Sequence, residues 1–215
     1  MLKKNKWAML LSSLVILLPL AVGLLLWDQL PERMPIHWNA AGEVDGWTGK
    51  ATGVFLMSPI LLIVHWLCVL VTGLDPKNKD KNEKAKQLIL WIMPVLSLLV
   101  NGLIYATALG REVNVDMLMP GMMGVLFVVL GNILPKCSRN STIGIKIPWT
   151  LHSDENWYAT HRLAGKLWIG GGLCIVGTVW LPMPLSLWIM LPVTAALVLI
   201  PCIYSYRFYK TKEEK

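Results

Sequence analysis

Six stretches of about 20 apolar residues dominate this chain and limit what it can fold into. An α-helix rises about 1.5 Å per residue, so roughly 20 apolar residues span the hydrocarbon core of a bilayer. Only 15% of the 215 residues are charged, whereas a soluble domain carries about 25%. The sequence therefore predicts an all-α, polytopic membrane protein, a bundle of six transmembrane helices. The predicted spans are residues 8–27, 53–74, 88–109, 117–134, 164–181 and 184–204.

The first apolar stretch follows three lysines, Lys3, Lys4 and Lys6, an arrangement that also describes a secretory signal peptide. This stretch is long enough to cross the bilayer, however, and no small-x-small cleavage site follows it. We therefore expect an uncleaved first helix. The last two spans are joined by a few residues around Pro182, so we expect them to form an antiparallel hairpin.

Basic residues fall almost entirely on one side of these spans. With the N-terminus inside, 17 of the 20 lysines and arginines lie in inner segments, and only Arg33, Lys50 and Arg111 lie outside. Cytoplasmic segments of membrane proteins carry such an excess, so we expect both termini in the cytoplasm. Topology then explains the net charge of +7. We therefore expect no direct binding of nucleic acid, and we interpret the lysine-rich run 77–86 as a solvated topology signal.

Polar residues inside the spans are few. The middle of each span lacks Asp, Glu, Lys and Arg, groups that pumps and ion-coupled transporters usually need. His65 and Asn101 are the buried polar candidates, and a hydrogen bond between helices is the commoner role for such residues. The four cysteines match no zinc or redox motif. We expect no disulfide framework, and we expect the cysteines to act as small buried hydrophobes.

The outer segment 28–52 is predicted to be extended and folded back on itself. Pro31 and Pro35 exclude a regular helix, and Gly42 and Gly46 belong to turn signals. The candidate site residues of this segment are His37, Trp38, Asn39, Gly42, Asp45 and Gly46. A metal site formed by His37, Glu43 and Asp45 is a weak alternative, because these residues lack helical spacing. We predict no metal site.

The inner segment, residues 131–166, is the longest polar connection on the cytoplasmic side. Pro148 pushes the residue before it out of helical geometry, and Ser153 can cap a helix that runs into the fifth span. On that helix Trp157, His161, Ala164 and Trp168 share one face. Arg162 and Lys166 lie on another face near the lipid headgroups, where they can snorkel or bind phosphate.

The inner segment also supplies the second set of candidate site residues. No nucleophile or paired carboxylate faces His161 and Arg162 by spacing, so we expect no catalytic residues, no cofactor and no enzyme. Two interpretations remain open: these residues bind a partner, or they only brace the loop against the bundle. The candidates are Asn132, Pro135, Lys136, Asn140, Gly144, Pro148, Trp149, Thr150, Trp157, His161, Arg162, Gly165 and Lys166.

Two motifs resemble one known family. The outer segment contains IHWN followed by GEVDG, and the inner segment contains GNILPK, GIKIPWTL and HRLAGK. This pattern resembles the SdpI immunity-protein family, including the N-terminal domain of unknown function typical of that family. The resemblance divides the chain into an N-terminal family domain, a middle segment of three spans, and the signature loop with the last two spans. These segments are residues 1–52, 53–130 and 131–215.

The resemblance implies a multi-pass immunity protein of the bacterial cytoplasmic membrane that protects the cell against a secreted, membrane-active peptide toxin. It also implies that a toxin-bound member can hold a cytoplasmic ArsR-type repressor at the membrane. Our hypothesis assigns toxin sensing to the outer segment and the conformational readout to the inner segment. The alternative is a small permease or export component for a peptide or lipid, with a polar pathway lined by His65 and Asn101.

Overall fold

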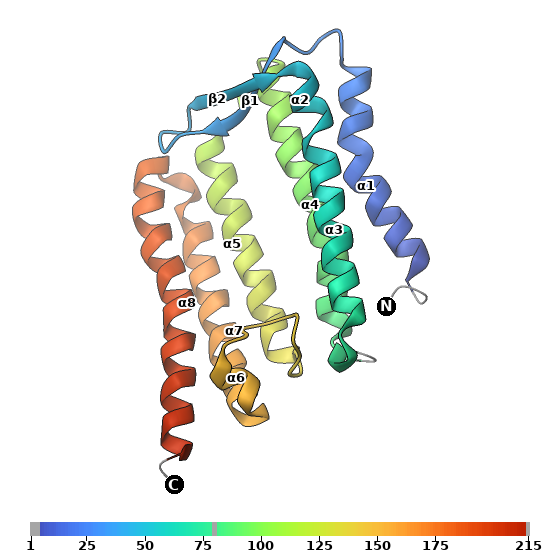
Figure 1. Ribbon diagram of the computed structural model, residues 1–215. Helices are drawn as coiled ribbons and strands as arrows, with labels where there is room; N and C mark the ends of the chain where they lie inside the picture. The colour runs from blue at the N-terminus through green and yellow to red at the C-terminus, as the bar shows by residue number, and fades with distance from the viewer. Residues whose placement is uncertain (1–4, 79–80, 214–215) are drawn as a thin grey trace. The chain divides into compact units, whose positions relative to one another are not determined.

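The computed structural model describes residues 5–78 and 81–213 (Figure 1). Six helical segments among these residues are long and apolar enough to cross a membrane, which confirms the predicted all-α polytopic fold. They are Lys6–Leu25, Lys50–Leu74, Glu83–Ala108, Val115–Lys136, Asp154–Trp180 and Met183–Lys212. The cytoplasmic position of both termini stays a prediction. Four of the lysines behind it, Lys3, Lys4, Lys79 and Lys215, lie outside the described residues.

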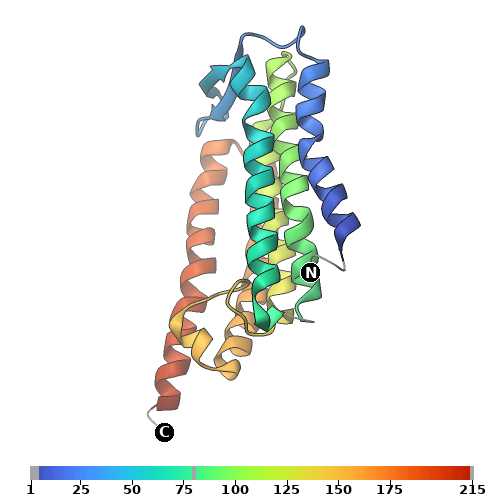
Figure 2. The same cartoon turned by 45° about the vertical axis from the view of Figure 1, so that its right-hand side comes forward.

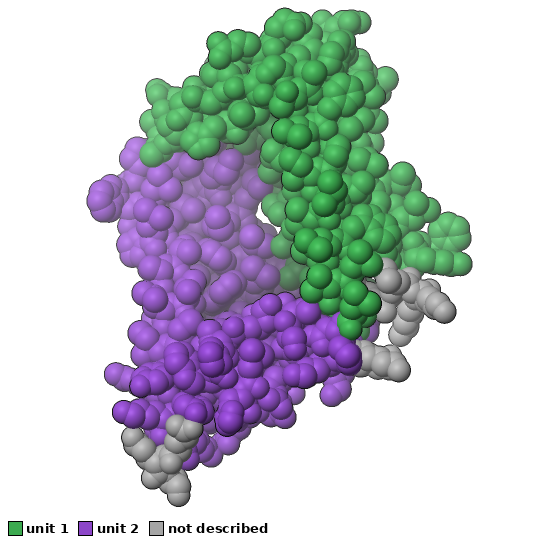
Figure 3. Space-filling view, viewed as in Figure 1, with its two compact units in different colours: residues 1–74, 86–114 green, residues 75–85, 115–215 purple. Residues whose placement is uncertain are grey.

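The chain divides into two compact units that do not follow its order (Figure 3). The first unit comprises residues 1–74 and 86–114, and the second comprises residues 75–85 and 115–215. The connection between the second and third spans therefore packs with the C-terminal half of the chain. The three segments predicted from the motifs, with boundaries after residues 52 and 130, describe the sequence rather than these packing units and stay a prediction.

In the first unit, three long helices run along one another beside a short antiparallel hairpin (Figures 1 and 2). The hairpin shares a hydrophobic core with the first and third of these helices. The elements are α1 (Lys6–Leu25), β1 (Arg33–Trp38), β2 (Val44–Gly49), α2 (Lys50–Phe55), α3 (Met57–Leu74) and α4 (Glu83–Ala108). The core residues are Leu30, Met34, Val54, Ile104 and Tyr105. Because Met34 of β1 is fully buried, the hairpin is anchored to the helices.

Buried hydroxyl groups of α4 bind the backbone of α1 where that helix contains a proline. Tyr105 Oη donates to the carbonyl oxygen of Pro19 at 3.0 Å, and Ser97 Oγ donates to that of Ile16 at 2.9 Å. Proline has no amide hydrogen and disturbs the hydrogen bonds of the helix around it. In hydrocarbon, polar backbone groups need internal partners, so the two hydroxyls stabilise α1 near Pro19.

His65 and Asn101 both make structural hydrogen bonds. His65 Nε2 lies 3.0 Å from Ser12 Oγ, which links α3 to α1 as predicted. Asn101 instead donates from Nδ2 to the carbonyl oxygen of Ser97, one turn earlier in its own helix. His65 Nδ1 and Asn101 Oδ1 are buried without a hydrogen-bond partner among the described residues. These two atoms are what remains for the alternative interpretation, a permease with a polar pathway lined by His65 and Asn101.

The second unit is a bundle of three long helices with the inner segment folded at one end (Figure 1). Its elements are η1 (Pro76–Asn78), α5 (Val115–Ile133), η2 (Leu134–Lys136), α6 (Pro148–His152), α7 (Asp154–Val176), η3 (Gly177–Trp180) and α8 (Met183–Glu213). Leu181 and Pro182 join η3 to α8, and Trp168 Nε1 of α7 donates to the carbonyl oxygen of Leu197 in α8 at 2.9 Å. The predicted hairpin of the last two spans is confirmed.

Two pairs of glycines bring α5 and α7 into backbone contact. A Cβ atom at Gly124 would lie 2.6 Å from the carbonyl oxygen of Gly172, and one at Gly131 would lie 2.8 Å from that of Gly165. The glycines are seven residues apart in each helix, so they lie on one face of each. Small residues at such contacts let helices pack closely in a membrane, where the hydrophobic effect does not drive association between helices.

This contact predicts that Gly172→Ala destabilises the protein by about 1–3 kcal/mol, because the new methyl group must push two backbones apart. The measurement is thermal unfolding of the detergent-solubilised protein. Gly170→Ala is the matched control, since no described atom lies within 4 Å of a Cβ at that position. Equal effects of the two changes would show that the close contact does not stabilise the bundle.

Candidate functional site

The predicted outer residues form a β-hairpin. β1 and β2 are antiparallel, with Pro35 opposite Trp47 and His37 opposite Gly46. Asn39 holds the turn, because its Oδ1 accepts hydrogen bonds from the amides of Ala41 at 2.8 Å and Glu43 at 3.1 Å. Gly42 has a φ of 75°, the left-handed region that glycine adopts most readily. The predicted extended segment with a turn is thus confirmed.

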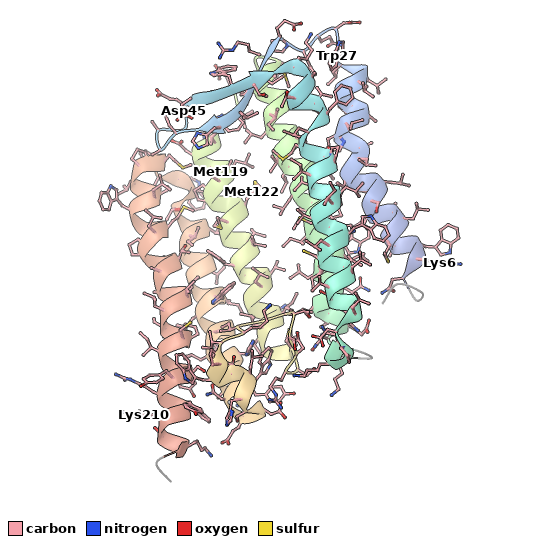
Figure 4. All side chains as sticks on the ribbon, viewed as in Figure 1. Lys6, Trp27, Asp45, Met119, Met122 and Lys210 are labelled. Atoms are coloured by element: carbon pink, nitrogen blue, oxygen red, sulfur yellow. The ribbon has the colours of Figure 1, made fainter. Side chains whose placement is uncertain are left out.

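His37 and Asp45 form an exposed polar pair across the hairpin. His37 Nδ1 lies 2.5 Å from Asp45 Oδ1, and Figure 4 marks Asp45 near the turn. A Cβ atom at Gly46 would lie 2.7 Å from the Cβ atom of His37, so glycine is needed opposite the histidine. Among the described residues there is no cluster of three metal-binding side chains. The hairpin therefore presents a hydrogen-bonded pair of polar side chains.

Apolar side chains lie on the same exposed hairpin. Ile36 and Trp47 are each 46% exposed, whereas the predicted site residue Trp38 packs against the core of the first unit. At the base of the hairpin, Lys50 Nζ binds Glu32 Oε1 at 2.9 Å and lies 5.4 Å from the ring centre of Trp27. The prediction of site residues did not include Ile36 and Trp47, although they give the hairpin an apolar contact surface.

In the second unit, Asn140 organises the turn that follows η2. Its Nδ2 donates to the carbonyl oxygens of Ser138 and Ile143, and its Oδ1 accepts from the amides of Thr142 at 2.8 Å and Ile143 at 2.6 Å. The side chain is fully buried. One amide group thus replaces the backbone hydrogen bonds that a regular helix or sheet would supply here.

Trp157 and His161 form the buried centre of the inner segment. Their rings stack with centroids 4.0 Å apart and an interplanar angle of 21°. Trp157 Nε1 donates to the carbonyl oxygen of Cys137 at 2.8 Å. His161 Nδ1 lies 2.8 Å from the carbonyl oxygen of Trp157, and His161 Nε2 accepts from the amide of Ile145 at 2.9 Å. A carbonyl only accepts, so Nδ1 carries the hydrogen and the neutral ring satisfies both bonds.

Gly144 and Thr150 close the inner segment over this pair of rings. Gly144 has a φ of 113°, and a Cβ atom there would lie 2.5 Å from His161 Nε2 and 3.1 Å from the ring of Trp157. Thr150 Oγ1 bonds to the carbonyl oxygens of Ile145 and Ile147 at 2.7 and 2.9 Å. Pro148 opens α6, where proline is well tolerated at the first position.

A second loop docks onto the inner segment. In this docking loop, defined as residues 75–78 with 81 and 82, Asn78 Nδ2 donates to Thr142 Oγ1 at 2.6 Å, and Asp75 Oδ2 accepts from the amide of Ser141 at 2.9 Å. Asn82 has a φ of 58°, and its Oδ1 accepts from the amide of Ser138 at 2.7 Å. The run interpreted as a solvated topology signal therefore contains specific contacts as well.

Ser153 and Asn156 fix the start of α7. Ser153 Oγ accepts from the amide of Asn156 at 3.3 Å, which confirms the predicted cap. The side chain of Asn156 donates to the carbonyl oxygen of Ser205 at 3.0 Å and accepts from Ser205 Oγ at 2.7 Å and Thr160 Oγ1 at 2.9 Å. This buried cluster joins α7 to α8, and its members were absent from the predicted site.

The remaining predicted residues lie around this buried centre. Pro135 packs closely on Gly165, where a Cβ atom on the glycine would clash with the proline ring. Lys136 Nζ donates to Asn132 Oδ1 at 2.7 Å on the exposed surface, and Trp149 packs against the ring of Tyr206. Arg162 and Lys166 are exposed on α7. The buried members thus brace the loop, and the exposed members are available to a partner.

The cysteines are free, as expected, and Cys137 lies in the core of the inner segment with Ala85 and Trp157. Burial raises the pKa of the Cys137 thiol to about 11, because a buried thiolate loses its hydration. Cys174 lies on the outer surface of α7 within a candidate membrane span, so it is not buried inside the protein. Trp157 contributes to the burial of Cys137, because the two residues pack in one hydrophobic cluster and the indole nitrogen donates to the Cys137 carbonyl oxygen.

Comparisons with known proteins agree with the two motifs. Residues 136–205 match the SdpI/YfhL protein family, and residues 14–62 match the domain of unknown function DUF1648. Over 213 residues the chain is 24% identical to the immunity protein SdpI of Bacillus subtilis (strain 168), and the match covers 97% of each chain. No solved structure matches the chain. The outer hairpin and most of the predicted inner residues fall inside the matched segments.

The contacts around Cys137 predict its reactivity. In a variant with the other three cysteines changed to alanine, a water-soluble thiol reagent should modify Cys137 slowly at pH 8, well below the pKa of about 11, because the thiol is then mostly protonated. Because the pKa is raised, the rate should increase as the pH rises towards 11.

Asn140→Ala should open the inner segment and accelerate this reaction by roughly tenfold or more, since thiolate fraction and access both increase. Asn132→Ala is the control, because it removes an exposed amide of the same type. A folded Asn140→Ala protein that reacts at the rate of the parent would show that the Asn140 hydrogen bonds do not hold the loop closed.

Proposed function

We infer that this chain, which belongs to the SdpI/YfhL protein family, is a membrane immunity protein that protects its cell against a secreted, membrane-active peptide toxin. The observation that carries this proposal is the match to the immunity protein SdpI, which runs through nearly the whole of both chains. It includes the spans as well as the loops. The six apolar helices are consistent with a protein of the bacterial cytoplasmic membrane, the place where a membrane-active peptide acts.

The outer hairpin is proposed to contact the toxin. It combines the exposed apolar side chains of Ile36 and Trp47 with the hydrogen-bonded pair of His37 and Asp45. Exposed apolar groups beside polar side chains suit an amphipathic peptide, because the apolar groups supply affinity and the polar groups select orientation. The distribution of Lys and Arg favours an extracellular position for this hairpin.

The docking loop is proposed to carry the signal from the hairpin to the inner segment. Along the chain, β2 leads into α2 and α3, and α3 ends at Leu74 directly before Asp75. A movement of α3 would therefore act on Asp75 and Asn78, which bind Ser141 and Thr142 in the inner segment. The same hydrogen bonds that brace the loop could transmit a displacement, because each has a defined partner that it can lose.

The exposed inner residues are proposed to form the readout. Lys136, Arg162 and Lys166 lie on the surface of the second unit, and the charge distribution favours the cytoplasm for them. A cytoplasmic repressor of the ArsR type, held at the membrane by this surface, would be kept away from its operator. The buried residues Trp157 and His161 would set the shape of that surface.

Expression of this chain in a bacterium sensitive to an SDP-type toxin tests the immunity proposal. We expect survival at toxin concentrations that kill the same strain carrying an empty vector, since the protein needs only to reach the membrane. Membrane fractionation verifies expression. Full sensitivity of cells with the protein in their membrane would contradict the proposal for that toxin class.

The division of labour between the two loops predicts separable defects. Asp45→Ala should reduce the survival of cells exposed to toxin, because it removes the hydrogen-bond partner of His37, and Arg33→Gln is the control on the same hairpin. Asn78→Ala should reduce membrane recruitment of a co-expressed, fluorescently tagged ArsR-type repressor while survival is largely retained. If the Asp45 and Asn78 variants impair both readouts equally, the loops do not divide these roles.

A further inference from the structure

A groove of about 540 Å³ lies between α7 and α8 in the second unit. Tyr158, Arg162, Leu163 and Lys166 line it from α7, and Tyr204 and Phe208 line it from α8. Its volume falls in the range of small-molecule sites, roughly 300–1,000 Å³. The groove combines two cations with aromatic and aliphatic walls, and this composition indicates an amphipathic ligand.

The two cations of the groove have no protein partner among the residues that the structure describes. The described residues supply neither an ion pair nor a side-chain hydrogen bond to Arg162 or Lys166, which lie one turn apart on α7. Arg139 in contrast bonds Asp154 Oδ1 at 2.7 Å. Glu155 at the rim is paired with Lys212 at 3.0 Å. The groove therefore keeps a net positive potential that an anion can satisfy.

Both helices change from apolar to basic at the level of the groove. On α7 the residues after Lys166 are uncharged to the end of the helix, and on α8 the first charged residue is Arg207. In a membrane protein, such a boundary between apolar and basic residues lies at the level of the lipid headgroups. Tyr158 and Tyr204 suit this depth, because a tyrosine has an apolar ring and a polar tip.

We propose that this groove binds the phosphate of an anionic phospholipid. Arg162 can donate two parallel hydrogen bonds to phosphate oxygens, and Lys166 can reach the same group as a flexible point charge. Leu163 and Phe208 then contact the start of an acyl chain. The site goes beyond the proposed immunity role, because it concerns the protein's interaction with its own bilayer. A lipid bound here would compete with the proposed repressor for Arg162 and Lys166.

Native mass spectrometry of the full-length protein in detergent, titrated with phosphatidylglycerol or phosphatidylcholine, tests the proposal. We expect one phosphatidylglycerol to be retained in preference to phosphatidylcholine. Inorganic phosphate at the same concentration should not displace it, because phosphate lacks the acyl chains. Equal retention of both lipids, or displacement by free phosphate, would overturn the proposal.

Variants distinguish this groove from general electrostatic attraction. The double change R162Q/K166Q should weaken retention of phosphatidylglycerol on the order of tenfold or more, since each surface cation contributes separately. R207Q/K210Q removes the same charge from α8 outside the groove lining, where Figure 4 labels Lys210, and should have little effect. Equal weakening by both pairs would indicate diffuse attraction and contradict the site.

A third variant keeps both charges and fills the groove. Ala159 also lines it, so Ala159→Phe should reduce lipid retention although Arg162 and Lys166 remain. An unfolding temperature close to that of the parent confirms that each variant is folded. Unchanged retention in this variant would contradict binding inside the groove. Toxin survival is not measured, so the result is independent of the immunity proposal.

Discussion

The inner segment depends on side chains that satisfy its backbone. Its irregular turns lie between a membrane-spanning helix and the start of the next, where unpaired backbone groups are costly. The Asn140 side chain forms hydrogen bonds with backbone amide and carbonyl groups of its turn, and the Thr150 hydroxyl donates to two backbone carbonyls. The His161 ring accepts a hydrogen bond from the amide of Ile145. Each of these side chains is buried. The buried motif residues therefore form one hydrogen-bonded core. A binding partner would have to contact the exposed surface around that core.

The rest of the second unit holds that core in place. Backbone contact between Gly131 and Gly165 holds the end of α5 against the middle of α7, and Asn156 joins α7 to α8. The docking loop adds contacts through Asp75 and Asn78. Because the docking loop continues directly from α3, the chain offers a covalent route from the outer hairpin to this core. The route requires no new contact to form, only a change in existing hydrogen bonds.

Local signals in the sequence predicted much of this architecture. The lengths of the apolar stretches predicted the six spans, and the positions of proline and glycine predicted the extended outer segment. Ser153 predicted the start of α7. The spacing of Trp157 and His161 placed them on one face, and both are buried. The docking of Asn78 on Thr142 was not predictable, because the partners are far apart in the chain and the run around Asn78 already had an explanation in topology. Similarly, no local sequence pattern predicts the contact between Asn156 and Ser205, which lie far apart in the chain.

In the proposed coupling, a toxin that acts on the outer hairpin changes the hydrogen-bonded core of the inner segment through the docking loop. Hydrogen exchange of the purified protein, followed by mass spectrometry with and without an SDP-type toxin, tests it most directly. We expect toxin to change amide exchange in the hairpin, in residues 75–78 and in residues 138–147 together, while the contact between α5 and α7 near Gly124 keeps its protection. A change confined to the hairpin would contradict the coupling between the two loops.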